Sequence, residues 1–357
     1  MTADLVAEGG GGSVESPGSS AAAVSTSATE AEEKILSPEG EEFEPLSETA
    51  QRVLSEGVPF ILGDLHRRLL ATKEGEAFAL SDLEGNFSFP NNVGMGLYYR
   101  DTRFLSLFEM RVNSAVPVLL SSSAERAYMS YVDLTNPDIW EEGELIIPQQ
   151  TINLRRTRVM GDLVHERIRI RNYNAHTVKV ILEFLMGADF ADIFEVRGLK
   201  REQRGKLLTP RIDGGTVKFA YRGTDEVFRE TWINFSKEPA ASRVEGGTVR
   251  TFFEFELGPH QTTTLSMAFE PIVAGERHER FDFDTSVERT RTSYLDWEQS
   301  STQIRTDNRL FDALLLRGLR DLRALLTKTH DGEILVGGIP WYVAPFGRDA
   351  IMTSYQI

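Results

Sequence analysis

Residues able to bind a sugar gather in one short segment of this sequence, residues 340–350. Trp341 and Tyr342 offer flat aromatic faces for the C–H surface of a pyranose. Arg348 and Asp349 offer charged groups that can bind pairs of hydroxyls, and they begin an expected helix whose amides and dipole favour the carboxylate. The segment predicts either a polyol-binding corner or a plain helix start with an acid in its first turn. The residue chemistry alone favours neither.

Composition restricts the classes to which this 357-residue chain can belong. It has 39 basic and 54 acidic side chains, a formal net charge of −15. Residues 1–56 contribute −10 of this, because they hold twelve acids against Lys34 and Arg52. Nucleic-acid binding needs a net basic face, so we expect no nucleic-acid partner, whereas neutral polymers such as glucans remain possible. The chain has no cysteine, which excludes disulfides, thiolate nucleophiles and cysteine-ligated zinc.

The histidines show no pattern that indicates chemistry. None has the spacing of a metal-ligand pair or a partner nucleophile, so each is expected to be structural or solvated; they are His66, His165, His176, His260, His278 and His330. We therefore expect no metal site and no cofactor.

The N-terminus and the apolar segments lead to an expectation about location. The first residues lack the basic start and the apolar stretch of an export signal. No segment approaches the roughly 18 apolar residues of a membrane span. With the absence of cysteine, these features favour a cytoplasmic protein that does not bind membranes.

The first 56 residues differ in composition from the rest. Residues 9–48 are rich in Gly, Ser, Ala and Glu and have almost no large apolar side chains, so they cannot offset the entropy lost on ordering. We interpret residues 1–56 as a disordered acidic tail. An acidic docking tail is the alternative, although no pattern within the segment favours it.

Residues 57–285 show the period of two that is typical of strands with one buried face. Val164, Ile168 and Ile170 belong to one such run. A turn at 258–260 is predicted to join two further strands into a hairpin. Together the strands predict a mainly β fold with a large antiparallel β-sandwich; those expected are 78–81, 104–112, 116–120, 151–159, 164–171, 178–186, 217–221, 227–235, 253–257 and 265–269.

The period changes to that of helices after residue 285. Residues 286–304 are expected to hold a polar linker helix, and residues 306–308 to cap a second helix from 309 to about 327. Asp331 and Gly332 end that helix, and another begins at Arg348. The second helix is rich in leucine on much of its circumference. One helical hairpin cannot bury so much leucine, so it either docks entirely on the sandwich or opens a larger helical domain.

Three charged clusters are interpreted as structural. Asp189, Asp192 and Glu195 recur every three residues, but no loop with the spacing of a cation site surrounds them, and we expect a strand-to-loop corner facing the next domain. Residues 100–103 are expected to form an interdomain ion-pair network. Six arginines on two strands are expected on a solvated sheet face; they are Arg155, Arg156, Arg158, Arg167, Arg169 and Arg171.

Three segments in the same order resemble bacterial glycogen-debranching, amylo-α-1,6-glucosidase-like glycoside hydrolases. Residues 338–349 resemble the loop that opens their catalytic domain, and residues 98–106 and 188–198 are similar to two segments of their N-terminal domain. The resemblance covers about residues 57–357. It implies a β-sandwich over residues 57–285, followed from residue 305 by an (α/α)6 toroid.

The resemblance also implies roles for the segment with which we began. Arg348 and Asp349 match the pair that grips the non-reducing terminal glucose, and Trp341 would line the same subsite. Residues 305–357 supply about one of the toroid's six helical hairpins, so we expect a truncated catalytic domain. The acid and base carboxylates of related inverting enzymes come from later loops. We therefore assign no catalytic residue in this chain.

The sequence thus predicts the N-terminal part of an α-glucan debranching hydrolase that releases α-1,6-linked glucose with inversion, and we expect the chain alone to be inactive. Its partner would be an α-glucan or oligosaccharide. Two alternatives remain open: a carbohydrate-binding or packing β-sandwich without catalysis, and a toroid hydrolase of a small glycoside. The sequence leaves the oligomeric state undetermined.

Overall fold

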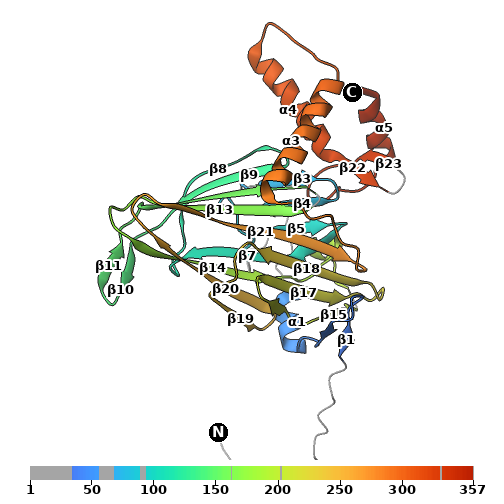
Figure 1. The fold of residues 1–357 in the computed structure, drawn as a ribbon. Coiled ribbons are helices and arrows are strands. Elements are labelled where there is room, and N and C mark those ends of the chain that lie inside the picture. The colour runs from blue at the N-terminus through green and yellow to red at the C-terminus, as the bar shows by residue number, and fades with distance from the viewer. Residues whose placement is uncertain are drawn as a thin grey trace, which may run out of the picture. The chain divides into compact units, whose positions relative to one another are not determined.

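The computed structural model describes residues 34–55, 68–88, 94–161, 163–201, 203–329 and 332–356. Antiparallel strands predominate in these residues, and most helices lie toward the end of the sequence (Figure 1). The predicted mainly β fold is therefore confirmed. Residues 1–33 of the predicted tail, together with His66, His330 and Asp331, lie outside the described residues.

Two sheets face each other across a shared apolar core. The ring centroids of Phe108 and Phe269 are 5.2 Å apart, and those of Phe184 and Phe235 are 6.1 Å apart, each pair joining the two sheets. In the described residues the smaller sheet has the order β19 (Ala241–Glu245), β20 (Thr248–Leu257), β14 (Val178–Gly187), β7 (Leu107–Val112). The larger has the order β15 (Lys206–Leu207), β17 (Thr216–Arg222), β18 (Phe228–Phe235), β21 (Thr262–Val273), β13 (Val164–Asn172), β12 (Ile152–Val159), β9 (Met129–Thr135), β8 (Val118–Arg126), with β16 (Arg211–Asp213) on β17.

A third sheet adjoins this sandwich. Its strands have the order β3 (Leu70–Glu74), β4 (Ala77–Ser81), β5 (Gly96–Tyr99), β6 (Thr102–Leu105). Phe87, after β4, exchanges backbone hydrogen bonds of 2.9 Å with Phe108 on β7. The predicted strand 104–112 is divided into β6 and β7 at Ser106. Outside the sheets, β10 (Ile139–Glu141) and β11 (Glu144–Ile147) form a separate hairpin.

The predicted hairpin across residues 258–260 is wrong. β20 pairs with β14 and β19 in the smaller sheet, whereas β21 pairs with β13 and β18 in the larger one. The chain therefore crosses from one sheet to the other at this turn. Alternation of apolar residues identifies the buried face of each strand, but it carries no information about which strand lies beside it.

The predicted disorder does not extend over residues 34–55. These residues form β1 (Ile35–Leu36), β2 (Glu42–Phe43) and α1 (Glu48–Ser55). Ile35 and Phe43 are buried against Leu208, Ala220 and Phe228 of the sandwich. The Leu46 amide donates a 2.8 Å hydrogen bond to the Leu207 carbonyl. A few apolar side chains suffice here because the sandwich supplies the rest of their surroundings.

Two helices follow the sandwich. α3 (Phe283–Ser300) begins three residues before the predicted start, capped by Asp282, and α4 (Arg309–Leu325) begins after the predicted cap residue Asn308. α4 ends before Thr327, because a hairpin of β22 (Leu326–Thr329) and β23 (Gly332–Leu335) follows it directly. The last helix is α5 (Gly347–Gln356). No described helix combines the length and the hydropathy that a membrane crossing requires.

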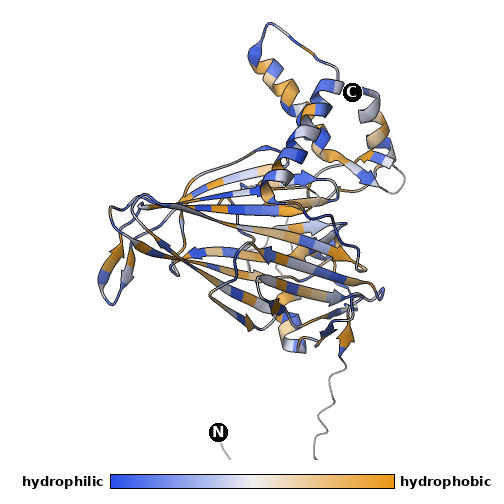
Figure 2. Cartoon of the chain, in the orientation of Figure 1, coloured by the Kyte–Doolittle hydropathy of each residue, from blue (hydrophilic) through white to orange (hydrophobic). Residues whose placement is uncertain are grey.

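α4 leaves much of its apolar surface uncovered. Leu310 is 83% exposed and Leu314 is 65% exposed, and Figure 2 shows hydrophobic residues along this helix. Among its residues only Ala324 is fully buried. The alternative that the helical hairpin docks entirely on the sandwich is therefore wrong.

Two of the six arginines expected on a solvated face are buried instead. Arg156 and Arg158 lie on β12 and both bind Glu166 on β13, with Nε–Oε distances of 2.7 and 2.8 Å. All three side chains are almost inaccessible to water. Burial alone would raise the pKa of the Glu166 carboxyl, but the two guanidiniums outweigh it and hold that pKa below its usual value. The alternation of these strands directs the arginines inward, where Glu166 compensates them.

Replacing Glu166 should therefore destabilise the fold strongly. We expect Glu166→Gln to lower the free energy of unfolding by about 3–5 kcal/mol, because two buried guanidiniums lose their counter-charge. Urea unfolding followed by circular dichroism measures this change. Asp133→Asn is the matched control, since Asp133 pairs with the more exposed Arg155 on the same strand and should cost about 1 kcal/mol or less. Equal effects of the two variants would contradict the expectation.

His165 makes stability depend on pH. It is buried between β13 and α3, with Nε2 2.9 Å from the Ser286 Oγ, and burial lowers its pKa to about 4. The unfolded chain takes up this proton at about pH 6.5, so the stability contributed by neutral His165 is lost as pH falls from about 6.5 to about 4. We expect His165→Gln to flatten the fall in urea midpoint over this range. His260→Gln, at the exposed turn, should keep the slope of the parent; equal slopes in all three proteins would refute the assignment.

Candidate functional site

The segment between β23 and α5 is folded back on itself. Val336 and Pro345 form an antiparallel bridge. Between them, the amide of Gly338 donates to the carbonyl of Tyr342 at 3.1 Å, and the amide of Tyr342 donates back at 2.8 Å. Gly337 is required for this close approach, since a Cβ there would lie 2.8 Å from the Tyr342 Cβ. The bridge and the turn place residue 342 near the start of α5.

An open cavity of about 590 Å³ lies beside this turn. Tyr342 and Phe346 lie in its wall, with ring centroids 5.8 Å apart at 65°. Arg348 and Asp349, at the first turn of α5, lie on the same cavity. Its remaining lining residues are Leu322, Leu325, Leu335, Val336, Gly337, Gly338 and Thr353. The cavity thus combines aromatic and aliphatic walls with one cation and one anion.

The predicted pair is accessible to a ligand. The side chain of Arg348 is 91% exposed and that of Asp349 is 60% exposed. The guanidinium Nε lies 3.5 Å from the carboxylate Oδ1, a loose contact that leaves most donors and acceptors of both groups available. Two of the three residues predicted to bind substrate therefore share one cavity.

Trp341 does not line this cavity. It is half-buried and packs with Ile339 and Val343 against a cluster that includes Phe78 and Tyr98 of the third sheet and Val196 of α2. Its backbone carbonyl accepts a 2.8 Å hydrogen bond from Arg197. The sequence predicted that Trp341 would line the same site as Arg348 and Asp349. In the structure the Trp341 ring packs on the protein, and the ring of the next residue, Tyr342, lies in the cavity wall instead. Phe346, which precedes the predicted pair, was not among the predicted binding residues.

The acidic corner after β14 is structural. Asp192 caps α2 (Ile193–Val196) and forms a reciprocal capping box with Glu195. Asp189 is buried and binds Arg103 through Nε–Oδ1 and Nη2–Oδ2 contacts of 3.1 and 2.5 Å. The interpretation as a strand-to-loop corner agrees with this geometry. Within the described residues, no three His, Asp or Glu side chains are arranged to hold a metal ion.

The prediction of an interdomain network for residues 100–103 is wrong. Arg100 binds Glu76 at 2.8 Å and Glu276 at 3.4 Å, and Arg103 binds Asp189. These partners all belong to the β-rich part of the chain. Arg100 and Asp101 have positive φ values and form the tight turn between β5 and β6, which directs the two arginine side chains to different places.

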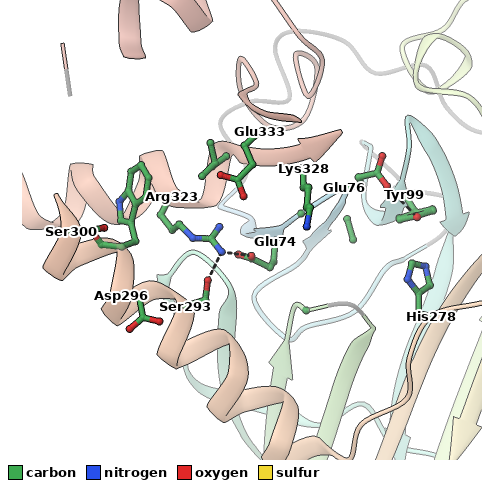
Figure 3. Close-up of a pocket in the computed structure, with 15 residues that line it drawn as sticks. Glu74, Glu76, Tyr99, His278, Ser293, Asp296, Ser300, Arg323, Lys328 and Glu333 are labelled. Atoms are coloured by element: carbon green, nitrogen blue, oxygen red, sulfur yellow. Dashed lines mark hydrogen bonds and ion pairs between the residues drawn. The ribbon is translucent and has the colours of Figure 1, made fainter. Parts of the chain in front are cut away.

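A second cavity, of about 650 Å³, lies where β3 meets α3, α4 and β22 (Figure 3). Its central contact is Arg323, which donates to Glu74 at 2.9 Å and to Ser293 at 2.7 Å. Burial raises the pKa of Glu74, and the Arg323 guanidinium opposes that rise. Sequence reasoning missed this cavity because its residues come from distant segments of the chain.

A buried lysine lies beside this second cavity. The Lys73 amine donates to the carbonyls of Gly75 and Ala324, at 2.6 and 3.0 Å, and to the Thr327 hydroxyl at 2.8 Å. Burial lowers its pKa to about 8. Ala324 lies in the last turn of α4, where a cation is favoured by the helix dipole. Lys73 and Glu74 on β3 thus connect this strand to the end of α4 through hydrogen bonds and an ion pair.

Comparisons with known proteins bear on the β-rich part of the chain. Residues 72–268 match the family described as the N-terminal domain of (some) glycogen debranching enzymes. No curated protein matches the chain. Among solved structures, a putative kojibiose phosphorylase from the human microbiome is 9% identical, with a TM-score of 0.36, and the similarity covers 83% of this chain and 39% of that one.

Two mutarotase-like proteins are also similar to the chain. A putative aldose 1-epimerase from Escherichia coli K12 is 8% identical over 60% of this chain and 99% of that one, with a TM-score of 0.35. A galactose mutarotase related enzyme from Lactobacillus acidophilus is 8% identical over 60% of this chain and 100% of that one, with a TM-score of 0.32. The family match covers more than half of the sequence. The chain therefore belongs to the family of glycogen debranching enzyme N-terminal domains.

Proposed function

We propose that this chain is part of a cytoplasmic α-glucan debranching hydrolase of the amylo-α-1,6-glucosidase type, and that Arg348 and Asp349 bind a terminal glucose of its substrate. The observation that supports this proposal best is the exposed pair beside Tyr342 and Phe346, on one cavity, in a chain of the glycogen debranching family. Such a cavity suits a neutral ligand with both an apolar face and hydroxyl groups.

The two charged residues have complementary roles in this proposal. The Arg348 guanidinium donates hydrogen bonds in a planar fork, which suits two neighbouring sugar hydroxyl oxygens. The Asp349 carboxylate accepts hydrogen bonds from hydroxyl protons and lies at the N-terminal end of α5, where the helix dipole favours it. Tyr342 and Phe346 offer apolar surface to the C–H groups of the ring.

The chemistry of cleavage requires a second set of groups. An inverting glycosidase needs a carboxylic acid at the leaving oxygen and a carboxylate that activates water, roughly 6.5–9.5 Å apart. Among the described residues that line the cavity, only Asp349 has a carboxyl group. We therefore assign substrate binding to this chain and the general acid and base to residues outside it.

Affinity for a glucan tests the binding role. We expect Arg348→Ala and Asp349→Asn each to weaken maltotetraose binding about tenfold or more in isothermal titration calorimetry, since a hydrogen bond to a charged group contributes about 1.5–3 kcal/mol. Arg317→Ala and Asp321→Asn are matched controls, because this exposed pair on α4 lies outside the cavity lining. They should leave affinity unchanged.

The same titrations distinguish the proposal from its alternative. If maltotetraose binds equally well to the parent and to both cavity variants, the sugar site lies elsewhere, and a carbohydrate-binding β-sandwich becomes the better account. If the parent does not bind the sugar at all, the proposed role of the cavity is wrong.

Hydrolysis is tested separately from binding. We expect the purified 357-residue chain to release no glucose from a glycogen limit dextrin above the level of a buffer blank, because the described residues that line its cavity include one carboxyl group and an inverting glycosidase needs two. A coupled enzymatic glucose assay measures the product. Glucose release that disappears in the Asp349→Asn variant would show that the chain itself is catalytic and would overturn our division of roles.

A further inference from the structure

One arginine of the β-rich part of the chain contacts the turn at Trp341 and Tyr342, beside the candidate sugar site, at several points. Arg197 follows α2, and its Nη2 donates a 2.8 Å hydrogen bond to the Trp341 carbonyl. Its guanidinium carbon lies 5.1 Å from the centroid of the Trp341 ring and 5.3 Å from that of the Tyr342 ring. Both distances are within the range in which a cation is attracted to an aromatic face. A single side chain therefore contacts two successive residues of the turn.

The chemistry of Arg197 suits this combination of contacts. A guanidinium is planar, so it can stack on rings while its edge donates to a carbonyl, which a lysine amine cannot do in the same way. Among the described residues, no carboxylate forms an ion pair with Arg197. Its charge therefore faces the Trp341 carbonyl and the rings of Trp341 and Tyr342, with the Phe194 ring of α2 farther away at 5.8 Å.

The corner that carries Arg197 is firmly held. The Arg197 amide donates to the Ile193 carbonyl at 3.1 Å, and the Ile193 amide donates to the Asp101 carbonyl at 2.9 Å. Ile193 and Val196 are buried in the cluster with Phe78 and Tyr98. Because α2 is hydrogen-bonded to the β5–β6 turn through Ile193 and packs on the third sheet through Ile193 and Val196, the position of Arg197 is set by the β-rich part of the chain.

The surroundings of Trp341 fit the same arrangement. Gly94 has a φ of +75°, and a Cβ at this position would lie only 3.2 Å from the Trp341 Cη2. The glycine therefore leaves room for the indole ring. Trp341 packs, half-buried, against the third sheet and α2, while the next residue, Tyr342, lies in the wall of the cavity. Contacts that hold the backbone at Trp341 therefore also determine the position from which the Tyr342 ring extends.

We propose that Arg197 is a positioning residue for glucan binding: it holds the Trp341–Tyr342 turn so that the Tyr342 ring completes the cavity beside Arg348 and Asp349. This inference rests on the proposed function of that cavity. It gives the β-rich part of the chain a specific role in the sugar site, since the residue that aligns the turn follows α2 and the residues that touch the sugar come from the segment after β23.

Variants of Arg197 test the proposal by affinity and by a spectroscopic signal. Arg197→Ala should weaken maltotetraose binding at least fivefold in titration calorimetry. In protein labelled with 5-fluorotryptophan, the same variant should shift the ¹⁹F resonance of Trp341, assigned from a Trp341→Phe sample, toward that of solvent-exposed tryptophan. Arg197→Lys should show intermediate values of both, because a lysine restores the charge but not the simultaneous stacking and hydrogen bond.

Arg201→Ala is the matched control. Arg201 lies in the same part of the chain and pairs with Asp192 and Glu195, and it should leave the affinity and the Trp341 resonance unchanged. If Arg197→Ala does not fold, as judged by circular dichroism, the comparison of Arg197→Lys with the parent decides. An unchanged affinity or an unchanged resonance in the Arg197 variants, with binding lost in Arg348→Ala, would overturn the role of Arg197 alone. Absence of binding in the parent would overturn the proposed function and this inference together.

Discussion

The buried contact of Glu166 with Arg156 and Arg158 is the interaction on which the rest of the structure depends. Arg156 also donates to the Glu84 carbonyl at 2.8 Å and to the Asn86 Oδ1 at 2.6 Å, in the loop that follows β4. The Asn86 Oδ1 in turn accepts from the Met110 amide on β7. One buried ion cluster therefore joins the larger sheet, the smaller sheet and the third sheet. Its desolvation is costly, and the cluster is compatible with folding only because every member has a partner.

The third sheet connects this ion cluster to the candidate site. At one strand, Lys73 and Glu74 bind the end of α4 and Arg323. At two others, Phe78 and Tyr98 form the surface on which Trp341 packs. The segment that carries the predicted sugar-binding residues is thus held mainly by contacts with β-strands and α2. This explains how its turn has a defined conformation although much of the neighbouring helix α4 is exposed to solvent.

Local patterns in the sequence predicted local structure well. The period of two identified many of the strands, although β3, β5 and β9 were not among those predicted. Residues 306–308 correctly indicated the start of α4 at its Asn308 cap. Pairing between distant segments was not predictable in this way, as the sheet change between β20 and β21 shows. Arg156 and Arg158 were assigned to a solvated face because charge in a strand is usually exposed. Their compensation by Glu166 becomes visible only once β12 and β13 are paired.

The candidate site was predictable where its residues are close in sequence. Arg348 and Asp349 share the cavity with Tyr342 and Phe346. Arg197 is 144 residues from Trp341, and its segment, residues 188–198, contributed to the family resemblance without indicating a role for this arginine. The two kinds of arginine–aspartate contact also differ in physical consequence. Arg103 and Asp189 are buried and bidentate, so exchanging this contact for a ligand would cost several kcal/mol. The contact between the exposed side chains of Arg348 and Asp349 stabilises the protein by at most about 1 kcal/mol. Exchanging this contact for hydrogen bonds to the hydroxyls of a ligand would therefore cost little.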